Sequence, residues 1–246
     1  MKLVSWNVFS GNEDPDAVRA FLKSCDADVV ALQEATATHL SILEDLGGYR
    51  LFVAEDFIED GVLYHLAIAS RLPADDHRVL AHNPERAVSP SIQGRRMKWI
   101  EGLESQSVAL TVGDAPVRLV NLHLPCGVAP ARRLADLDAA AAHLDGADRA
   151  VLCGDFNMFA RPLLNLLGGW LFGVGLGEIG ADERRRLDRF AAGHGLDRLF
   201  DRAVTFPRYR LHLDHILLRG LTARRARVET ATYGSDHYPL IAELAP

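Results

Sequence analysis

The chain has 246 residues, of which 48% are hydrophobic and 24% are charged, and its formal net charge is −6 at pH 7. This balance is typical of a globular protein with a sizeable core, and it excludes a chain that is mainly disordered, fibrous or coiled-coil. The negative charge also excludes a global positive field for long nucleic acids, so any polyanion has to bind to a local patch.

The first predicted elements form a strand–helix–strand unit over residues 3–33. Apolar runs at 3–8 and 28–33 have the length of buried strands. Between them, Asp14 is the expected N-cap of a helix with Pro15 at its first position. A second helix is predicted over 38–46 and ends at Gly47 and Gly48.

The remaining elements alternate between strands and helices, with an antiparallel region in the middle of the chain. Strands are predicted near 50, 62–69, 78–82, 97–103, 107–112, 117–123, 149–153, 213–218, 223–229 and 239–244, and helices over 130–144 and 181–193. No Pro/Ser-rich linker divides the chain. We therefore expect one α/β domain over 1–246, built from two mixed β-sheets packed face to face with helices outside.

Polar residues end successive apolar strands, which is the most informative feature of the sequence. Alone, each of them is most simply a helix cap, a turn residue or a satisfied histidine. Together they favour a site, because the carboxyl ends of strands in α/β sheets form the usual ligand crevice. The residues are Asn7, Glu34, His123, Asp155 with Asn157, Asp214 and Asp236 with His237.

These residue types favour phosphate chemistry. Carboxylates and carboxamides are hard oxygen ligands that suit Mg²⁺ or Mn²⁺ and leave room for substrate oxygens. Hydrolysis of a phosphoester needs groups that stabilise developing negative charge and an oriented base for water. Asp155, His123 and His237 supply those groups.

The order of the motifs resembles one family over nearly the whole chain. The motifs are Ser5-Trp6-Asn7-Val8, Leu32-Gln33-Glu34, Ala67-Ile68-Ala69-Ser70-Arg71, Asn121-Leu122-His123-Leu124, Gly154-Asp155-Phe156-Asn157, Leu213-Asp214-His215-Ile216 and Ser235-Asp236-His237. The set is similar to the endonuclease/exonuclease/phosphatase (deoxyribonuclease-I-like) superfamily of metal-dependent phosphoesterases. The resemblance implies a four-layer α/β sandwich, two packed mixed sheets flanked by helices.

The resemblance also implies roles for individual residues. Glu34 would be the principal ligand of Mg²⁺ or Mn²⁺, with Asn7 and Asp236 at the metal or its water shell. Asp214 would orient His237, which would bind the scissile phosphate or transfer a proton. The other implied roles are water activation for Asp155, phosphate binding for Asn157 and His123, and substrate binding for Asn121 and Arg71.

The sequence leaves the substrate open. The leading interpretation is hydrolysis of a phosphodiester by activated water, with a DNA or RNA nuclease as the alternative. A phosphomonoesterase, a sphingomyelinase-like lipid phosphodiesterase and a non-catalytic binding protein rank lower. The substrate partner is thus a nucleotide, a nucleic acid or a phospholipid head group. The acidic charge and the run Arg210-Leu211-His212-Leu213-Asp214-His215 disfavour a DNA-repair specificity.

Other signals carry less weight. Residues 175–180 match a dinucleotide fingerprint, but the second strand that such a site needs is missing. Residues 163–180 are apolar, yet their glycines favour a loop beside the active site over a stable membrane span. The basic clusters at 95–98 and 224–227 are typical of solvated faces, and His212 and His215 lack the motifs of a zinc site.

Cysteine usage and the start of the chain bear on its location. Cys25, Cys126 and Cys153 are odd in number and contain no Cys-x-x-Cys pair, so no secreted disulfide framework is indicated. No apolar leader precedes the first strand. We expect a cytoplasmic protein with no obligate protein partner and no nucleophilic Ser or Cys constellation.

Overall fold

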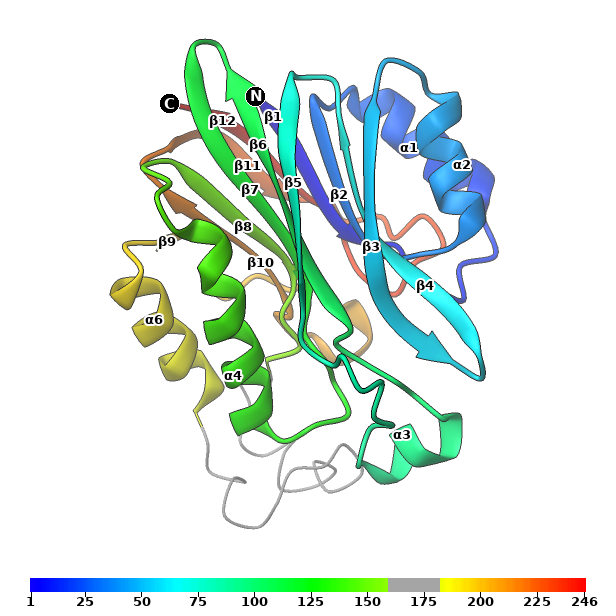
Figure 1. The fold of residues 1–246 in the computed structure, drawn as a ribbon. Helices are drawn as coiled ribbons and strands as arrows, with labels where there is room; N and C mark the ends of the chain where they lie inside the picture. The colour runs from blue at the N-terminus through cyan, green and yellow to red at the C-terminus, as the bar shows by residue number, and fades with distance from the viewer. Residues whose placement is uncertain (159–181) are drawn as a thin grey trace.

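The computed structural model describes residues 1–158 and 182–246. Its core is a pair of six-stranded mixed sheets that pack face to face, with helices on both outer faces. Figure 1 shows α1 and α2 on one outer side and α4 and α6 on the other. The predicted four-layer sandwich is confirmed. The loop at 163–180 and the fingerprint at 175–180 lie outside the described residues.

The first sheet has the strand order β11-β12-β1-β2-β4-β3. Its strands are β1 (Lys2–Asn7), β2 (Val29–Ala35), β3 (Arg50–Glu59), β4 (Val62–Ser70), β11 (Thr222–Val228) and β12 (Leu240–Ala245). Only β1 and β2 pair in parallel, and α1 (Pro15–Cys25) connects them. As predicted, the Asp14 side chain caps α1, accepting a hydrogen bond from the Ala17 amide. The second helix, α2 (Ala37–Asp45), follows β2.

The second sheet repeats this plan with the order β5-β6-β7-β8-β10-β9. Its strands are β5 (Ala74–Ala81), β6 (Glu104–Val112), β7 (Ala115–His123), β8 (Ala150–Asp155), β9 (Asp197–Arg198) and β10 (Asp214–Arg219). Here β7 and β8 form the parallel pair. The connection between them contains α4 (Pro130–Ala140) and a 3₁₀ turn (Ala141–Leu144), while α6 (Glu183–Gly193) precedes β9.

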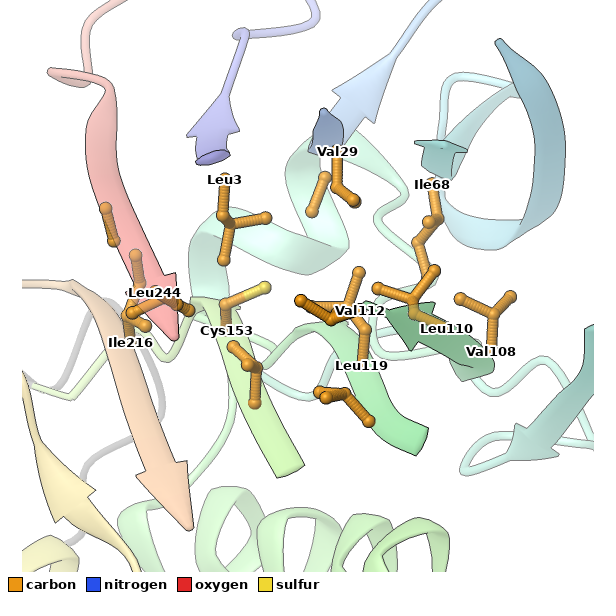
Figure 2. Close-up of a cluster of buried hydrophobic side chains, with 14 of the residues drawn as sticks. Leu3, Val29, Ile68, Val108, Leu110, Val112, Leu119, Cys153, Ile216 and Leu244 are labelled. Atoms are coloured by element: carbon orange, nitrogen blue, oxygen red, sulfur yellow. The ribbon is translucent and has the colours of Figure 1, made fainter. Parts of the chain in front are cut away.

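Apolar side chains from both sheets fill the space between them. Figure 2 shows Leu3, Val29 and Ile68 of the first sheet facing Leu119 and Cys153 of the second. Two further clusters lie between each sheet and its own helices. Each fully buried aliphatic side chain stabilises the fold by roughly 1.5–3 kcal/mol relative to an exposed one. These three clusters therefore hold the strand ends in place.

One predicted strand is wrong. Residues near 97–103 do not form a strand; instead α3 (Ile92–Met97) begins after Ser91, whose hydroxyl caps the Gly94 amide. Ile100 forms an isolated bridge to Ile58 of β3, and the Leu103 amide donates to the Asp56 carbonyl at 3.0 Å. The predicted helix over 130–144 is α-helical only as far as Ala140.

Among residues 1–158 and 182–246, no helix is long and apolar enough to cross a membrane.

Candidate active site

Four of the predicted strand ends meet at one end of the sandwich. Asn7 ends β1, Glu34 lies near the end of β2, His123 ends β7 and Asp155 ends β8. Asn7 connects the two sheets, because its Nδ2 donates hydrogen bonds to Glu34 Oε1 at 2.8 Å and to Asp155 Oδ2 at 3.1 Å. The structure thus brings these four side chains together at one end of the sandwich.

Unusual backbone geometry aims two of these groups. The pairing of β2 with β4 is interrupted by a bulge between Leu32 and Ala35, and within it Glu34 has a φ of 58°. A bulge redirects the side chain that it contains, and here the Glu34 carboxylate accepts a hydrogen bond from the Ser10 amide at 2.9 Å. In β8, Gly154 has a φ of 136°, and a Cβ there would lie 1.9 Å from the Leu122 carbonyl oxygen. The close approach of β7 and β8 therefore requires glycine.

His237 is fixed from several sides. Its Nδ1 lies 2.7 Å from Asp214 Oδ2, and its backbone amide donates to the Ser235 hydroxyl at 2.9 Å. That hydroxyl donates in turn to the Asn7 carbonyl at 2.7 Å. Asp214 begins β10, which runs antiparallel to β8, so it stands at the same edge as Asp155. The Asp214 carboxylate thereby leaves Nε2 of His237 to face the site.

His123 is oriented in the same way by a residue that the sequence analysis missed. Its Nδ1 lies 2.9 Å from Asp56 Oδ1, and Asp56 Oδ2 accepts the Glu34 backbone amide at 2.7 Å. Asp56 is buried on β3, on the same face as Phe52 and Ala54. A carboxylate on the buried face of a strand was the signal that could have found it.

Both histidines direct Nε2 toward Asp155. The distances to Asp155 Oδ2 are 3.8 Å from His123 and 3.6 Å from His237. Burial alone would lower the pKa of His237, but the charges of Asp214 and Asp155 outweigh it and raise the pKa to about 10. Burial would also lower the pKa of His123, but the charge of Asp56 and its hydrogen bond outweigh burial and raise the pKa of His123 well above its usual value. The site thus places two histidine rings, each held at Nδ1 by a carboxylate, beside the buried Asp155 carboxylate.

Asn157 completes this side of the site. It has a φ of 48°, and its backbone amide donates to Asp155 Oδ1 at 2.9 Å. Its side-chain amide nitrogen lies 3.1 Å from His123 Nε2 and donates to the Leu124 carbonyl at 2.9 Å. Asn157 therefore fixes the Asp155 carboxylate through its backbone amide, and its side chain lies beside the His123 ring.

Two donor sets at the site fit a divalent cation. Asp155, Asp214 and His237 offer ligand atoms that all lie within 4.8 Å of one another, but Asp214 already binds His237. Glu34 and Asp236 are more open, with side chains 16% and 39% exposed against 2% for Asp155. Mg²⁺ keeps several waters in proteins, so it requires an open position. Of the predicted ligands, Glu34 and Asp236 meet that requirement better, whereas Asn7 is fully buried and its Oδ1 accepts the Phe9 amide.

Two predicted substrate-binding residues take other positions. Arg71 follows β4, which runs antiparallel to β2, so it lies at the far end of the sheet and pairs with Asp26. Asn121 is fully buried; its Nδ2 donates to the Leu32 and Ala67 carbonyls, and its Oδ1 accepts from Gln33 at 2.7 Å. The predicted substrate contacts of both residues are therefore wrong: Arg71 lies at the opposite end, and Asn121 ties the sheets together beneath the site.

Comparison with known protein families and structures agrees with this geometry. The model of the Endonuclease/Exonuclease/phosphatase family matches residues 4–237. No curated protein sequence matches the chain.

Solved structures of related fold are similar over the whole chain. An endonuclease/exonuclease/phosphatase from Beutenbergia cavernae has 15% identity and a TM-score of 0.74, covering 99% of this chain and 71% of its own. A 3′ phosphatase, NExo, from Neisseria, bound to a product DNA hairpin, has 19% identity and a TM-score of 0.64, with 100% of both chains covered. TDP2 from D. rerio, complexed with a single-strand DNA product, has 16% identity and a TM-score of 0.68, covering 100% of this chain and 99% of its own. The match over residues 4–237 shows that the chain belongs to the endonuclease/exonuclease/phosphatase family of phosphoesterases.

Proposed function

We propose that this protein hydrolyses phosphodiesters with the aid of Mg²⁺ or Mn²⁺, by direct attack of water and without a covalent enzyme intermediate. The observation that carries the proposal is the placement of two oriented histidine rings, His123 and His237, whose Nε2 atoms lie 3.8 Å and 3.6 Å from Asp155 Oδ2. Cations bind the anionic group, and the carboxylate between them is positioned to act on water.

Substrate binding would use the hydrogen-bond donors of the site. Nε2–H of His123 and Nε2–H of His237 would donate to the non-bridging oxygens of the phosphate. Such donors stabilise charge that develops in the transition state, and removal of one typically lowers turnover by about 10²–10³-fold. Asp56 and Asp214 hold the two rings through Nδ1, so the donors are oriented before the substrate binds.

Water activation is assigned to Asp155. Its Oδ1 accepts the Asn157 amide and its Oδ2 accepts from Asn7, so the carboxylate is held rigidly. As water attacks phosphorus, its proton passes to Asp155 and the bond to the leaving oxygen breaks. Glu34, with Asn7 and Asp236, would hold a metal ion, which would supply Lewis-acid stabilisation of the phosphoryl oxygens.

The charge of the site favours diesters over monoesters. Glu34, Asp56, Asp155, Asp214 and Asp236 place five carboxyl groups around two histidines. A phosphomonoester carries about −1.5 to −2 charges at pH 7 because its second pKa is near 6, whereas a diester carries one. The excess of carboxylates therefore repels a monoester more strongly.

The test compares bis(p-nitrophenyl) phosphate with p-nitrophenyl phosphate, each with Mg²⁺, Mn²⁺ or EDTA. We expect cleavage of the diester that requires a divalent ion and exceeds cleavage of the monoester. In Glu34→Gln, Mn²⁺ binding measured by titration calorimetry should weaken. Equal rates with EDTA and Mn²⁺ would contradict the proposal, and unaltered Mn²⁺ binding in Glu34→Gln would refute the choice of ligands.

A further inference from the structure

The loop that follows β1 orients two of the side chains assigned to the metal site. Its Phe9 amide donates to Asn7 Oδ1 at 3.0 Å, and its Ser10 amide donates to the Glu34 carboxylate at 2.9 Å. Phe9 has a φ of 63°, in the left-handed region that residues other than glycine seldom adopt. The Asn12 backbone amide closes this turn by donating to the Phe9 carbonyl at 3.0 Å. The shape of the turn therefore decides where the two amides point.

The loop between β11 and β12 carries the third of these side chains, Asp236. Two successive residues before it, Tyr233 and Gly234, have positive φ angles of 49° and 85°. The Tyr233 ring stacks on the Phe21 ring of α1, with 4.5 Å between the ring centroids. The turn that leads into Asp236 is therefore fixed against the helix into which the loop after β1 leads.

The side chain of Asn12 joins the two loops. Its Nδ2 donates to the Val8 carbonyl at 3.0 Å in its own loop and to the Tyr233 carbonyl at 3.1 Å in the other. Its Oδ1 accepts the Asp14 amide at 2.9 Å. A Cβ on Gly234 would lie 2.2 Å from Asn12 Oδ1, so the two loops are in direct contact here. Because both Nδ2 hydrogens are used within the protein, Asn12 acts on the loops rather than on a ligand.

Contact between the loops matters because the two open carboxylates come from different parts of the chain. Glu34 lies on β2 and takes a hydrogen bond from the first loop, whereas Asp236 belongs to the second loop. Mg²⁺ demands oxygens at nearly fixed distances in octahedral geometry, so a changed spacing of the two carboxylates weakens its binding. Polar groups that hold metal ligands in place typically change metal affinity by about 10- to 100-fold.

We propose that Asn12 is a positioning residue that sets the spacing of the Glu34 and Asp236 carboxylates and thereby the affinity of the site for a divalent cation. The inference rests on the proposed function, which assigns these two carboxylates to the metal. It adds a residue that lies in none of the motifs by which the sequence resembles its family.

Titration calorimetry of the full chain with Mn²⁺ tests the assignment. We expect the Kd for Mn²⁺ to rise about 10- to 100-fold in Asn12→Ala. The Mn²⁺ concentration that gives half-maximal turnover of bis(p-nitrophenyl) phosphate should rise by the same factor, while kcat at saturating Mn²⁺ stays close to the wild-type value. This split separates positioning of the metal ligands from a loss of folded protein, which would lower turnover at every Mn²⁺ concentration.

Asn83→Ala is the matched control. The Asn83 side chain also bonds to the backbone three times, donating to the Ala87 and Glu101 carbonyls and accepting the Ala87 amide, but its loop carries none of the assigned metal ligands. It should keep the wild-type Kd for Mn²⁺. Asn12→Ser is a second variant, because a hydroxyl has one donor and can bond only one of the two carbonyls. Its Kd should lie between those of the wild type and Asn12→Ala.

Two results would overturn this inference and leave the proposed function intact. One is a wild-type Kd for Mn²⁺ in folded Asn12→Ala and Asn12→Ser. The other is an equal rise of the Kd in Asn83→Ala. If the wild-type protein binds no Mn²⁺ and cleaves the diester equally well with EDTA, the proposed function fails and this inference fails with it.

Discussion

Replacing Asp56 by asparagine removes one charge that serves two parts of the site. The carboxylate accepts from His123 Nδ1 at 2.9 Å and from the Glu34 amide at 2.7 Å, and its side chain is 1% exposed. Asparagine has nearly the same shape, but one of its two terminal atoms is a donor. Its oxygen can therefore accept from only one of the two donors, and its NH2 group faces the other.

The loss in free energy of unfolding depends on whether His123 keeps its proton in the variant. Removing one partner of a buried ion pair costs about 3–5 kcal/mol when the other charge stays unpaired. His123 can release its proton, so the loss is closer to that of a hydrogen bond to a charged group, about 1.5–3 kcal/mol. For a chain of this length, that corresponds to a decrease in Tm of roughly 3–12 °C.

Activity should fall further than stability indicates. Either His123 loses the acceptor that orients its protonated ring, or Glu34 loses the bond that holds its backbone in the bulge, so kcat/KM for bis(p-nitrophenyl) phosphate should fall about one hundredfold. Asp60→Asn is the matched control, because Asp60 lies in the exposed turn of the same hairpin. Asp56→Asn with wild-type kcat/KM and Tm would refute this reasoning.

Three other changes test the packing around the site. Gly154→Ala should lower the free energy of unfolding by more than about 3 kcal/mol, because the added Cβ would clash with the Leu122 carbonyl oxygen. A Tm within 2 °C of the wild-type value, which corresponds to about 1 kcal/mol, would contradict this prediction. Arg133→Met removes the buried guanidinium that lies 2.8 Å from the Glu183 carboxylate and should lower the free energy of unfolding by about 3–5 kcal/mol in urea, with partial recovery in the double variant with Glu183→Leu. Burial lowers the pKa of His143 from 6.5 to about 4. Between these two pH values His143 binds a proton in the unfolded chain but not in the native protein. The free energy of unfolding therefore falls as the pH falls through this range. His143→Gln should remove about 1–2 kcal/mol of the loss measured between pH 7 and pH 5, and an unchanged loss would count against it.

The sequence predicts the site as far as strand direction can be read from it. Asn7, Glu34, His123 and Asp155 follow strands of the two parallel pairs, whose carboxyl ends share one edge, and the structure brings them together. Arg71 also follows a strand, but β4 is antiparallel to β2, which places Arg71 at the opposite edge. Pairing direction depends on contacts between distant strands, and no local pattern encodes it.

Contacts between the sheets were equally hidden. Asn121 looks like a polar strand residue near the site, but it bonds to carbonyls of the other sheet. Asp56 lies inside a predicted strand region and belongs to none of the quoted motifs, yet it orients His123. The sequence analysis does not predict the short helix α3, because its residues show no clear hydrophobic periodicity. Its start is fixed by the Ser91 hydroxyl, which accepts a hydrogen bond from the Gly94 amide.

The central claim is that Asp155 activates water at a metal-dependent phosphodiesterase site. The most direct measurement is the turnover of bis(p-nitrophenyl) phosphate with Mn²⁺ by Asp155→Asn, compared with Asp114→Asn in the exposed turn between β6 and β7 at the far end of the sheet. We expect Asp155→Asn to lose about 10²–10⁴-fold in kcat while its unfolding curve shows a folded protein, and Asp114→Asn to match wild type. Retention of wild-type turnover by folded Asp155→Asn would contradict the account.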